Sequence, residues 1–377
     1  MRPELHPHPG YSSLLPRRPR PIVVVGAGGI VRDAHLPAYV KAGFPVAALV
    51  DLVPERAREL AERYGVPAVH DSVADAVAAA PADAVFDVAL PPEAHVEVLE
   101  LLPDGAPVLL QKPLGNDLAA GLRTLEVCRR KRLVAAVNTQ LRFAPYVAAA
   151  RELIASGGLG ELVDLEVRVS VRTPWEMFPY VRGLDRLEIN MHSVHYLDLV
   201  RSFLGDPTGV SAMTVPHPGS TLANTRTAVL LHYADRPVRV TVSTNHDHVF
   251  GPRHEESFIK WEGTRGAVRA QMGLLLDYPS GGSDTLELAR LDEAERGWQP
   301  VPFEGSWFPD AFIGSMGVLQ RFATGELDSL PTSVEDVFRS MAVVEAAYRA
   351  TAAGGLRPPY EDRAAGPDPD PETEGEA

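Results

Sequence analysis

The stretch "IVVVGAGGIVRDAHLPAY" (22–39) has the residue types of a phosphate-binding loop. A run of β-branched residues leads into Gly26 and Gly28, and a helix is expected to begin directly after them. At such a turn the backbone N–H groups point outward and the helix dipole favours negative charge. Gly26 forms the turn, Gly28 lets a pyrophosphate approach the backbone, and Gly29 gives extra room. The loop therefore predicts a dinucleotide site.

Two further positions refine this prediction. Val31 occupies the place of the third glycine in the G-x-G-x-x-G pattern. That glycine serves close packing of helix on strand, so its loss leaves the phosphate contacts in place. Asp51 follows the second apolar run, where a carboxylate can accept hydrogen bonds from the adenosine ribose hydroxyls and repels a 2′-phosphate. We therefore expect NAD as the cofactor, with NADP as the weaker alternative.

The elements that would position these residues follow from the apolar pattern. Up to about residue 141, short apolar runs alternate with amphipathic stretches such as "PERARELAERYG" (54–65), which are bounded by proline and glycine. This alternation is typical of βαβ units and predicts a doubly wound parallel sheet of the Rossmann type. Its strands are expected at 22–27, 46–51, 84–90, 107–113 and 133–138.

Beyond about residue 145 the pattern changes to period-two alternation, which indicates a sheet with one exposed face. A helix near 188–204 interrupts these strands, and helices near 309–325 and 333–353 end the fold. The fold class is α/β, with an N-terminal Rossmann domain and a C-terminal α+β domain that holds an open, mainly antiparallel sheet. The strands of this second sheet are expected at 161–172, 225–234, 236–248, 256–263 and 266–272.

These patterns divide the chain into segments with different expected roles. Residues 1–20 are interpreted as a flexible arm and residues 21–141 as the NAD-binding Rossmann domain. Residues 142–330 are expected to form the substrate and oligomerisation domain. Residues 331–357 are expected to form a closing helix, and residues 358–377 a disordered acidic tail.

The composition excludes several classes of partner. A formal net charge of −14 argues against nucleic acid and against anionic lipid, because both attract basic surfaces. A single cysteine, Cys128, rules out a disulfide framework and suits a reducing compartment. No apolar run reaches the roughly 18 residues that a membrane span needs. We expect a cytoplasmic protein that binds neither nucleic acid nor membrane.

At "LLQKPLGNDLAAG" (109–121) the sequence resembles the glucose–fructose oxidoreductase/inositol dehydrogenase (Gfo/Idh/MocA) family, which carries a Glu-Lys-Pro motif at the end of its fifth strand. The likeness extends from about residue 22 to residue 357. Further similar segments are "LPPEAHVEV" (90–98), "NTQLRFAPYVAAARELIASGGLGEL" (138–162), "HYLDLVRSFLGDP" (195–207), "WEGTRGAVRA" (261–270) and "TSVEDVFRSMAVVEAAYRA" (332–350).

The resemblance implies an NAD(P)-dependent oxidoreductase that interconverts a secondary alcohol and a ketone on a sugar, a sugar derivative or a cyclitol. It also implies an open sheet that supports the substrate site and the contacts of a homodimer or homotetramer. Carried over by position, Lys112 lies beside the reacting carbon and His195 is the acid–base histidine. A histidine can take the hydroxyl proton, and a lysine can stabilise the alkoxide or exchange the proton itself. The other expected contacts are Ile30, Leu90, Pro91, His95, Gln111 and Pro113 for the cofactor and Arg142 for the substrate.

Each catalytic assignment has a structural alternative. Lys112 would then be an ordinary surface lysine after a strand, although ligands sit at the C-terminal strand ends of a doubly wound sheet. His195 would be a helix histidine whose hydrogen bonds are satisfied by Asp198. In the catalytic interpretation, Asp198 orients His195 instead.

Two positions depart from the family pattern. Gln111 stands where the family usually has glutamate, so a negative charge near the nicotinamide ribose is lost but hydrogen bonding is kept. Met191 stands where many members have an aspartate, four residues before the helix histidine. At about 100° per residue, Glu188, His192 and His195 share one helix face. We expect His192, backed by Glu188, to replace the aspartate; the alternative is that both cover a solvated or core face.

The run "TNHDHVFGPRHEE" adds more histidines. His246 and His248 would share a strand face, and His254 follows a Gly-Pro turn. We expect these side chains to line a polar sugar site with Glu188 and His192, because sugars need many hydrogen-bond donors and acceptors. The alternative is a divalent metal bound by the same residues. No His-x-x-x-His spacing supports it, so no metal is expected.

Two other functions stay open at this point. A tightly held NAD that oxidises a sugar hydroxyl transiently, permits elimination of a substituent and returns the hydride would make the protein a glycosidase or lyase with no net redox change. A non-catalytic sensor of dinucleotide or sugar is the other alternative, and the presence of Lys112 and His195 counts against it.

Overall fold

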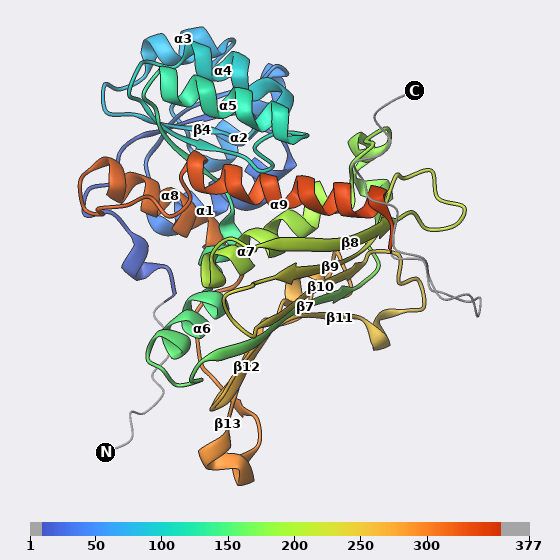
Figure 1. Cartoon of the computed structure of the whole chain (residues 1–377). Helices are drawn as coiled ribbons and strands as arrows, with labels where there is room; N and C mark the ends of the chain where they lie inside the picture. The colour runs from blue at the N-terminus through green and yellow to red at the C-terminus, as the bar shows by residue number, and fades with distance from the viewer. Residues whose placement is uncertain (1–9, 356–377) are drawn as a thin grey trace.

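The computed structural model describes residues 10–355 and arranges them in two domains, each built on one sheet (Figure 1). The first sheet has six parallel strands in the order β3-β2-β1-β4-β5-β6. This is the strand order of the Rossmann fold, so the predicted doubly wound sheet is confirmed. Its strands are β1 Ile22–Val25, β2 Val46–Val50, β3 Ala68–His70, β4 Val85–Val88, β5 Pro107–Leu110 and β6 Val134–Val137.

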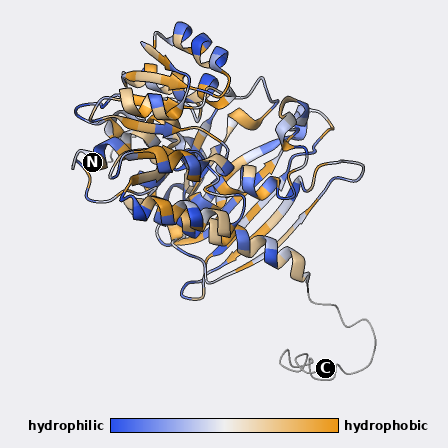
Figure 2. Cartoon of the chain, turned by 90° about the horizontal axis from the view of Figure 1, so that it is seen from above, coloured by the Kyte–Doolittle hydropathy of each residue, from blue (hydrophilic) through white to orange (hydrophobic). Residues whose placement is uncertain are grey.

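Both faces of this sheet are covered by helices. Side chains alternate along β1, so Ile22 and Val24 pack on one face while Val23 and Val25 pack on the other. Burial on both faces explains why the strands are continuous apolar runs. In Figure 2 the helices show hydrophilic and hydrophobic residues side by side, as expected of helices with one buried face. One face carries α1 Leu36–Ala42, α2 Pro54–Tyr64 and α8 Asp310–Ala323, and the other α3 Val73–Ala79, α4 His95–Leu101, α5 Leu118–Arg130 and α9 Val334–Ala353.

The second sheet has eight strands in the order β14-β13-β12-β11-β7-β10-β9-β8. Only β7 and β10 pair in parallel; the other neighbours are antiparallel, which confirms the predicted open, mainly antiparallel sheet. The strands are β7 Leu162–Ser170, β8 Gly209–Val215, β9 Arg226–His232, β10 Arg239–Asn245, β11 Glu256–Gly263, β12 Gly266–Gln271, β13 Thr285–Arg290 and β14 Gln299–Pro300.

Helices cover only one face of this second sheet. They are α6 Pro145–Ala155, α7 Val194–Leu204 and the C-terminal half of α9, which runs along β8 (Figure 1). The opposite face carries ion pairs such as Lys260–Glu166. Among residues 10–355, none of the helices is both long and apolar enough to cross a lipid bilayer.

Two segments lie elsewhere than the expected boundaries place them. Helix α8, assigned from the sequence to the 142–330 domain, packs its Phe312 and Met316 into the core of the Rossmann domain. Residues 10–20, expected to belong to a flexible arm, lie along α8, where the Arg20 N–H donates to Gln320 (2.8 Å). Contacts between chain segments 300 residues apart leave no local signal in the sequence. The rest of the expected arm and the acidic tail lie outside the described residues.

A buried ion-pair network joins the two domains. Arg142, which follows β6, donates to both carboxylate oxygens of Asp198 in α7, at 2.6 and 2.5 Å. It also donates to Asp336 in α9 (2.6 Å), and the Ser340 hydroxyl donates to Asp198 (2.6 Å). The side chains of Arg142 and Asp198 are 8% and 1% exposed. Because every charge in the network is paired, removal of one partner would leave a buried charge without compensation.

We predict that Arg142→Met lowers the free energy of unfolding by about 3–5 kcal/mol, because Asp198 then stays buried without its cation. Urea denaturation of the purified protein measures this change. The matched control is Arg168→Met, since the Arg168–Glu256 pair is 43% and 44% exposed and should contribute less than about 1 kcal/mol. Equal losses in the two variants would contradict the role given to Arg142.

Candidate functional site

The loop after β1 has the geometry of a dinucleotide site. Gly26 has a φ of +106°, and a Cβ there would lie 2.7 Å from the Ala89 carbonyl oxygen, so only glycine is accommodated. A Cβ at Gly28 would meet no atom within 4 Å. The backbone at Gly28 is therefore open to a ligand, while the neighbouring turn is closely packed.

Asp51 lies against this loop. Its Oδ2 accepts a hydrogen bond from the Ala27 N–H (2.6 Å), and its Oδ1 accepts one from the Val53 N–H (2.8 Å). Each carboxylate oxygen keeps a second lone pair for a further donor. A carboxylate held next to the glycine turn fits the hydroxyls of an adenosine ribose, so these residues suit the predicted dinucleotide.

The helix after the loop starts with a π-helical turn, Val31–His35 (η2). Val31 is fully buried in the core of the Rossmann domain, so the position of the missing third glycine serves packing. The exposed Gly29 and the half-buried Ile30 lie between Gly28 and this turn. The glycine loop thus ends where the packed helix begins.

A buried polar network behind the loop was missed by the sequence analysis. The His35 Nδ1–H donates to Asp87 (2.7 Å), and the Tyr39 hydroxyl donates to the same carboxylate oxygen (2.7 Å). His35 Nε2 then accepts from the side-chain amide of Gln111 (3.1 Å), whose oxygen accepts from the Lys112 N–H (2.9 Å). An amide serves both neighbours, whereas a carboxylate would offer only acceptors. The network accounts for glutamine at the family's glutamate position.

The remaining expected cofactor residues lie at the ends of β4 and β5. His95 is fully buried, and its Nε2–H donates to the Leu90 carbonyl (3.2 Å). Burial lowers the pKa of His95 to about 4, so the ring is neutral and holds the Leu90–Pro91 turn from inside the domain. Pro91 is exposed and Pro113 is buried.

Lys112 crosses from the Rossmann domain to the second domain. Its Nζ donates to the backbone carbonyl of Met191 (2.8 Å). Many family members have an aspartate at this position, so here a neutral carbonyl oxygen contacts the lysine in place of a carboxylate. Burial lowers the pKa of Lys112 to about 8, with no carboxylate opposing the shift. The amine therefore loses its proton close to neutral pH.

Met191 lies in a second π-helical segment, Ile189–Ser193 (η7), directly before α7. The expected rotation of 100° per residue is wrong for this segment, because a π-helix bonds residues five apart. Glu188 and Ser193 are therefore neighbours, and the Ser193 hydroxyl donates to both oxygens of the fully buried Glu188 carboxylate, at 2.8 and 2.9 Å. The Glu188 N–H donates to the side-chain oxygen of Asn224 (3.2 Å).

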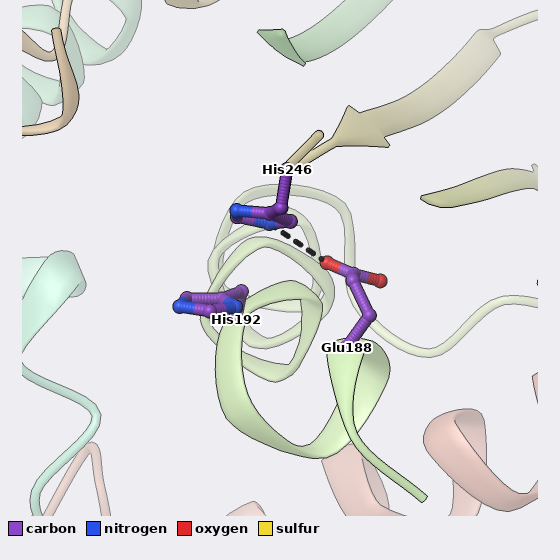
Figure 3. Close-up of side chains that lie close together, drawn as sticks. All are labelled: Glu188, His192 and His246. Atoms are coloured by element: carbon purple, nitrogen blue, oxygen red, sulfur yellow. Dashed lines mark ion pairs between the residues drawn. The ribbon is translucent and has the colours of Figure 1, made fainter. Parts of the chain in front are cut away.

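Three of the predicted site residues come together here. The rings of His192 and His246 stack with centroids 4.1 Å apart, and Glu188 lies beside them (Figure 3). His246 directly follows β10; its Nδ1 lies 2.8 Å from the Thr173 hydroxyl and its Nε2 3.4 Å from a Glu188 oxygen. The edge-on ring of Trp175 lies 5.6 and 5.7 Å from the two imidazoles. The structure therefore brings Glu188, His192 and His246 together, although not through the expected helix period.

His195 lies in the first turn of α7 and is buried. Burial and the positive charge of Lys112 hold the pKa of His195 well below its usual value. Burial, His246, Lys112 and His195 together do the same to His192. Both rings are therefore neutral at pH 7 and available as proton acceptors.

Four predicted roles are not reproduced by the arrangement. Arg142 and Asp198 bond to each other, so the arginine is engaged in the ion pair between the domains and the aspartate does not orient His195. His248 is half-buried against a phenylalanine ring, and His254 is exposed on a short 3₁₀ turn. The strand ends before these histidines, so the expected alternation no longer applies to them.

A Rossmann sheet with an open glycine loop, joined to a second, mainly antiparallel domain, defines a two-domain dinucleotide-dependent oxidoreductase. The chain belongs to the Gfo/Idh/MocA oxidoreductase family. The model of the "Oxidoreductase family, NAD-binding Rossmann fold" matches residues 20–139, and that of the "GFO/IDH/MocA C-terminal domain" matches residues 147–269. The resemblance inferred from the motifs is confirmed.

Individual relatives cover nearly the whole chain. A D-apiose dehydrogenase of Rhizobium rhizogenes is 24% identical over 342 residues, which are 88% of this chain and 95% of that protein. An inositol 2-dehydrogenase of Burkholderia ambifaria is 26% identical over 349 residues, 89% of this chain and 95% of that protein. A solved oxidoreductase from Agrobacterium radiobacter, in complex with NAD+, L-tartaric acid and magnesium, has the same fold with a TM-score of 0.72, 21% identity and coverage of 89% and 97% of the two chains.

The glycine loop allows binding and stability to be separated. We predict that Gly28→Ala leaves the urea midpoint unchanged but weakens NAD binding at least about tenfold, or about 1.4 kcal/mol, because its methyl group occupies the open space. Gly26→Ala should instead destabilise the fold by more than about 1 kcal/mol, because the φ of Gly26 is positive and the Ala89 carbonyl oxygen lies close to the added methyl group. Fluorescence titration with NAD and urea denaturation measure the two effects. Unchanged NAD affinity in Gly28→Ala would contradict this placement of the pyrophosphate.

Proposed function

We propose that this protein is an NAD-dependent dehydrogenase that interconverts a secondary alcohol and a ketone on a sugar, a sugar derivative or a cyclitol. The observation that carries the proposal is the position of Lys112, whose amine bonds to the Met191 carbonyl beside two neutral histidines. The activities named for the D-apiose and inositol relatives support the substrate class.

The chemistry needs a group that takes a hydroxyl proton, and Lys112 suits that task. Its pKa of about 8 makes the neutral amine available near neutrality. The nicotinamide, when bound, supplies the acceptor for the hydride that leaves the carbon. As the hydroxyl proton moves to Nζ, the resulting ammonium stabilises the oxygen that becomes the carbonyl. The neutral His195 is a second proton acceptor beside Lys112 and takes the proton on from Nζ.

The groups around Lys112 suit a polyol. Trp175 has a buried indole N–H that bonds to no atom of the described residues, and aromatic faces pack against the apolar faces of sugar rings. His192 is half-buried and neutral, so it can both donate and accept. These groups recognise hydroxyls without adding charge to the site.

Asp51 supports NAD over NADP in this proposal. Its carboxylate is held against the glycine loop by the Ala27 and Val53 N–H groups, and a 2′-phosphate there would meet a negative charge. No arginine or lysine among residues 10–355 pairs with Asp51 to offset that charge.

The first test follows NADH absorbance with a panel of sugars, sugar derivatives and cyclitols. We predict NADH formation that rises with pH through an apparent pKa near 8 in kcat/KM, because the neutral amine is the active form. Lys112→Met should lower kcat/KM by about 10²–10⁴-fold and abolish this step in the pH profile. A profile that is flat across pH 7–9 in the wild type would contradict the assignment of Lys112. Release of a leaving group from a glycoside, without net NADH, would replace the proposal by the transient-oxidation alternative.

The second test concerns cofactor choice. Asp51→Ser removes the carboxylate but keeps a hydrogen-bonding hydroxyl, so we predict at least a tenfold shift of the kcat/KM ratio towards NADP, about 1.4 kcal/mol. The control is Asp71→Ser, because Asp71 follows the next strand and is exposed. An unchanged NAD:NADP ratio in Asp51→Ser would remove Asp51 from the cofactor site.

A further inference from the structure

We propose that Glu188, His192 and His246 bind a divalent transition-metal ion of the zinc type. Each residue offers one ligand atom, and these atoms all lie within 4.8 Å of one another. Figure 3 shows the two imidazoles stacked on one side and the carboxylate beside them. Two imidazoles and a carboxylate are a ligand set typical of zinc and related ions, whereas magnesium and calcium prefer oxygen alone.

The distance between His246 and Glu188 favours an ion between them. Nε2 of His246 lies 3.4 Å from the Glu188 oxygen, yet this buried nitrogen has no hydrogen-bond partner among the described residues. A direct hydrogen bond would be 2.7–3.2 Å long. Two ligands of one tetrahedral zinc ion, each bonded at about 2.0–2.2 Å, are about 3.4 Å apart. The pair therefore has the spacing of ligands that share an ion.

The groups behind the ligands hold them in a metal-binding orientation. The Thr173 hydroxyl bonds to Nδ1 of His246 (2.8 Å), which leaves Nε2 directed towards Glu188. The Ser193 hydroxyl donates to both Glu188 oxygens. Hydrogen bonds of this kind to the far side of a ligand are the usual support of metal sites, because they fix the imidazole tautomer and the carboxylate direction.

The charge of Glu188 also calls for a cation. The carboxylate is fully buried, and within residues 10–355 its only ion-pair partner is His246. A buried carboxylate without compensation is costly, and a divalent ion would supply the compensation directly. The alternative is that the ion pair with His246 alone balances Glu188.

The ion would have a use in the reaction proposed above. His192 is only half-buried, so coordination positions would stay open, and its ring lies near enough to Lys112 and His195 for their charges to act on it. Two neighbouring hydroxyls of a polyol would occupy these positions, and coordination would ease the loss of the hydroxyl proton. Only this use rests on the proposed function; the binding of the ion does not.

The test is a titration of the chelator-treated, full-length protein with Co²⁺, which reports coordination through its visible absorbance, followed by competition with Zn²⁺. We expect about one equivalent to bind per chain and Zn²⁺ to displace it. Glu188→Gln and His246→Gln should each weaken binding at least tenfold, about 1.4 kcal/mol. The control His254→Gln removes an exposed histidine of the following turn and should bind like the wild type. Circular dichroism confirms that each variant is folded.

Equal Co²⁺ binding by the wild type and both ligand variants, or no stoichiometric binding by the wild type, would overturn the metal site and leave Glu188 and His246 as a simple ion pair. A ligand variant that does not fold is replaced by His192→Gln, whose side chain is partly exposed. Metal binding is measured without substrate or NAD. Its failure therefore leaves the dehydrogenase proposal intact, and absent NADH formation leaves the metal result intact.

Discussion

The buried positive charge of Arg142 determines how the two domains of this protein meet. It lies just after the last strand of the Rossmann sheet and pairs with carboxylates from α7 and α9. Charges so deeply buried tolerate little displacement, because any loss of contact leaves them without solvent or partner. The start of α7 is thereby held against the strand ends that carry Lys112. The histidines of the site depend on this arrangement, since His192 and His195 lie on the segment that Arg142 fixes.

Charge in the site is distributed differently from the family pattern. Lys112 meets a backbone carbonyl instead of a carboxylate, so burial lowers its pKa without opposition. The nearest carboxylates do not bond to Lys112 itself. Asp87 is linked to Gln111 through His35, and Glu188 lies beside His246. Both carboxylates are buried and hydrogen-bonded. The site thus keeps neutral proton acceptors next to the lysine and holds its anions in fixed positions beneath them.

The sequence was most informative where local pattern and burial coincide. Continuous apolar runs identified the buried parallel strands, and Gly26 with Asp51 predicted a loop whose geometry suits a dinucleotide. The edge strand β3 was missed because it is three residues long and none of them is fully buried. Asp87 was overlooked although it interrupts the apolar run 84–90, and that interruption was the available signal for the network with His35. Whether a polar residue pairs inward, as Arg142 does, depends on distant segments and cannot be obtained from spacing.

The π-helical segment before α7 shows that residues expected to lie together can do so through a different helix geometry. An α-helical period brought Glu188, His192 and His195 to one face, whereas the actual segment brings Glu188 next to Ser193 and leaves the Met191 carbonyl to meet Lys112. π-Helical turns occur often at functional sites. No residue type in this stretch marks the change of period, so only the tertiary structure reveals it.

The return of α8 to the Rossmann domain has a consequence for the order of events during synthesis. The six strands of the first sheet are complete at Val137, but the helix that covers part of one face ends at Ala323 and the one that covers part of the other ends at Ala353. A ribosome therefore exports the six strands together with α1–α5 long before α8 and α9. Part of each face of the first sheet therefore stays uncovered while the second domain is translated, and the core of the first domain is completed only after Ala353 has emerged.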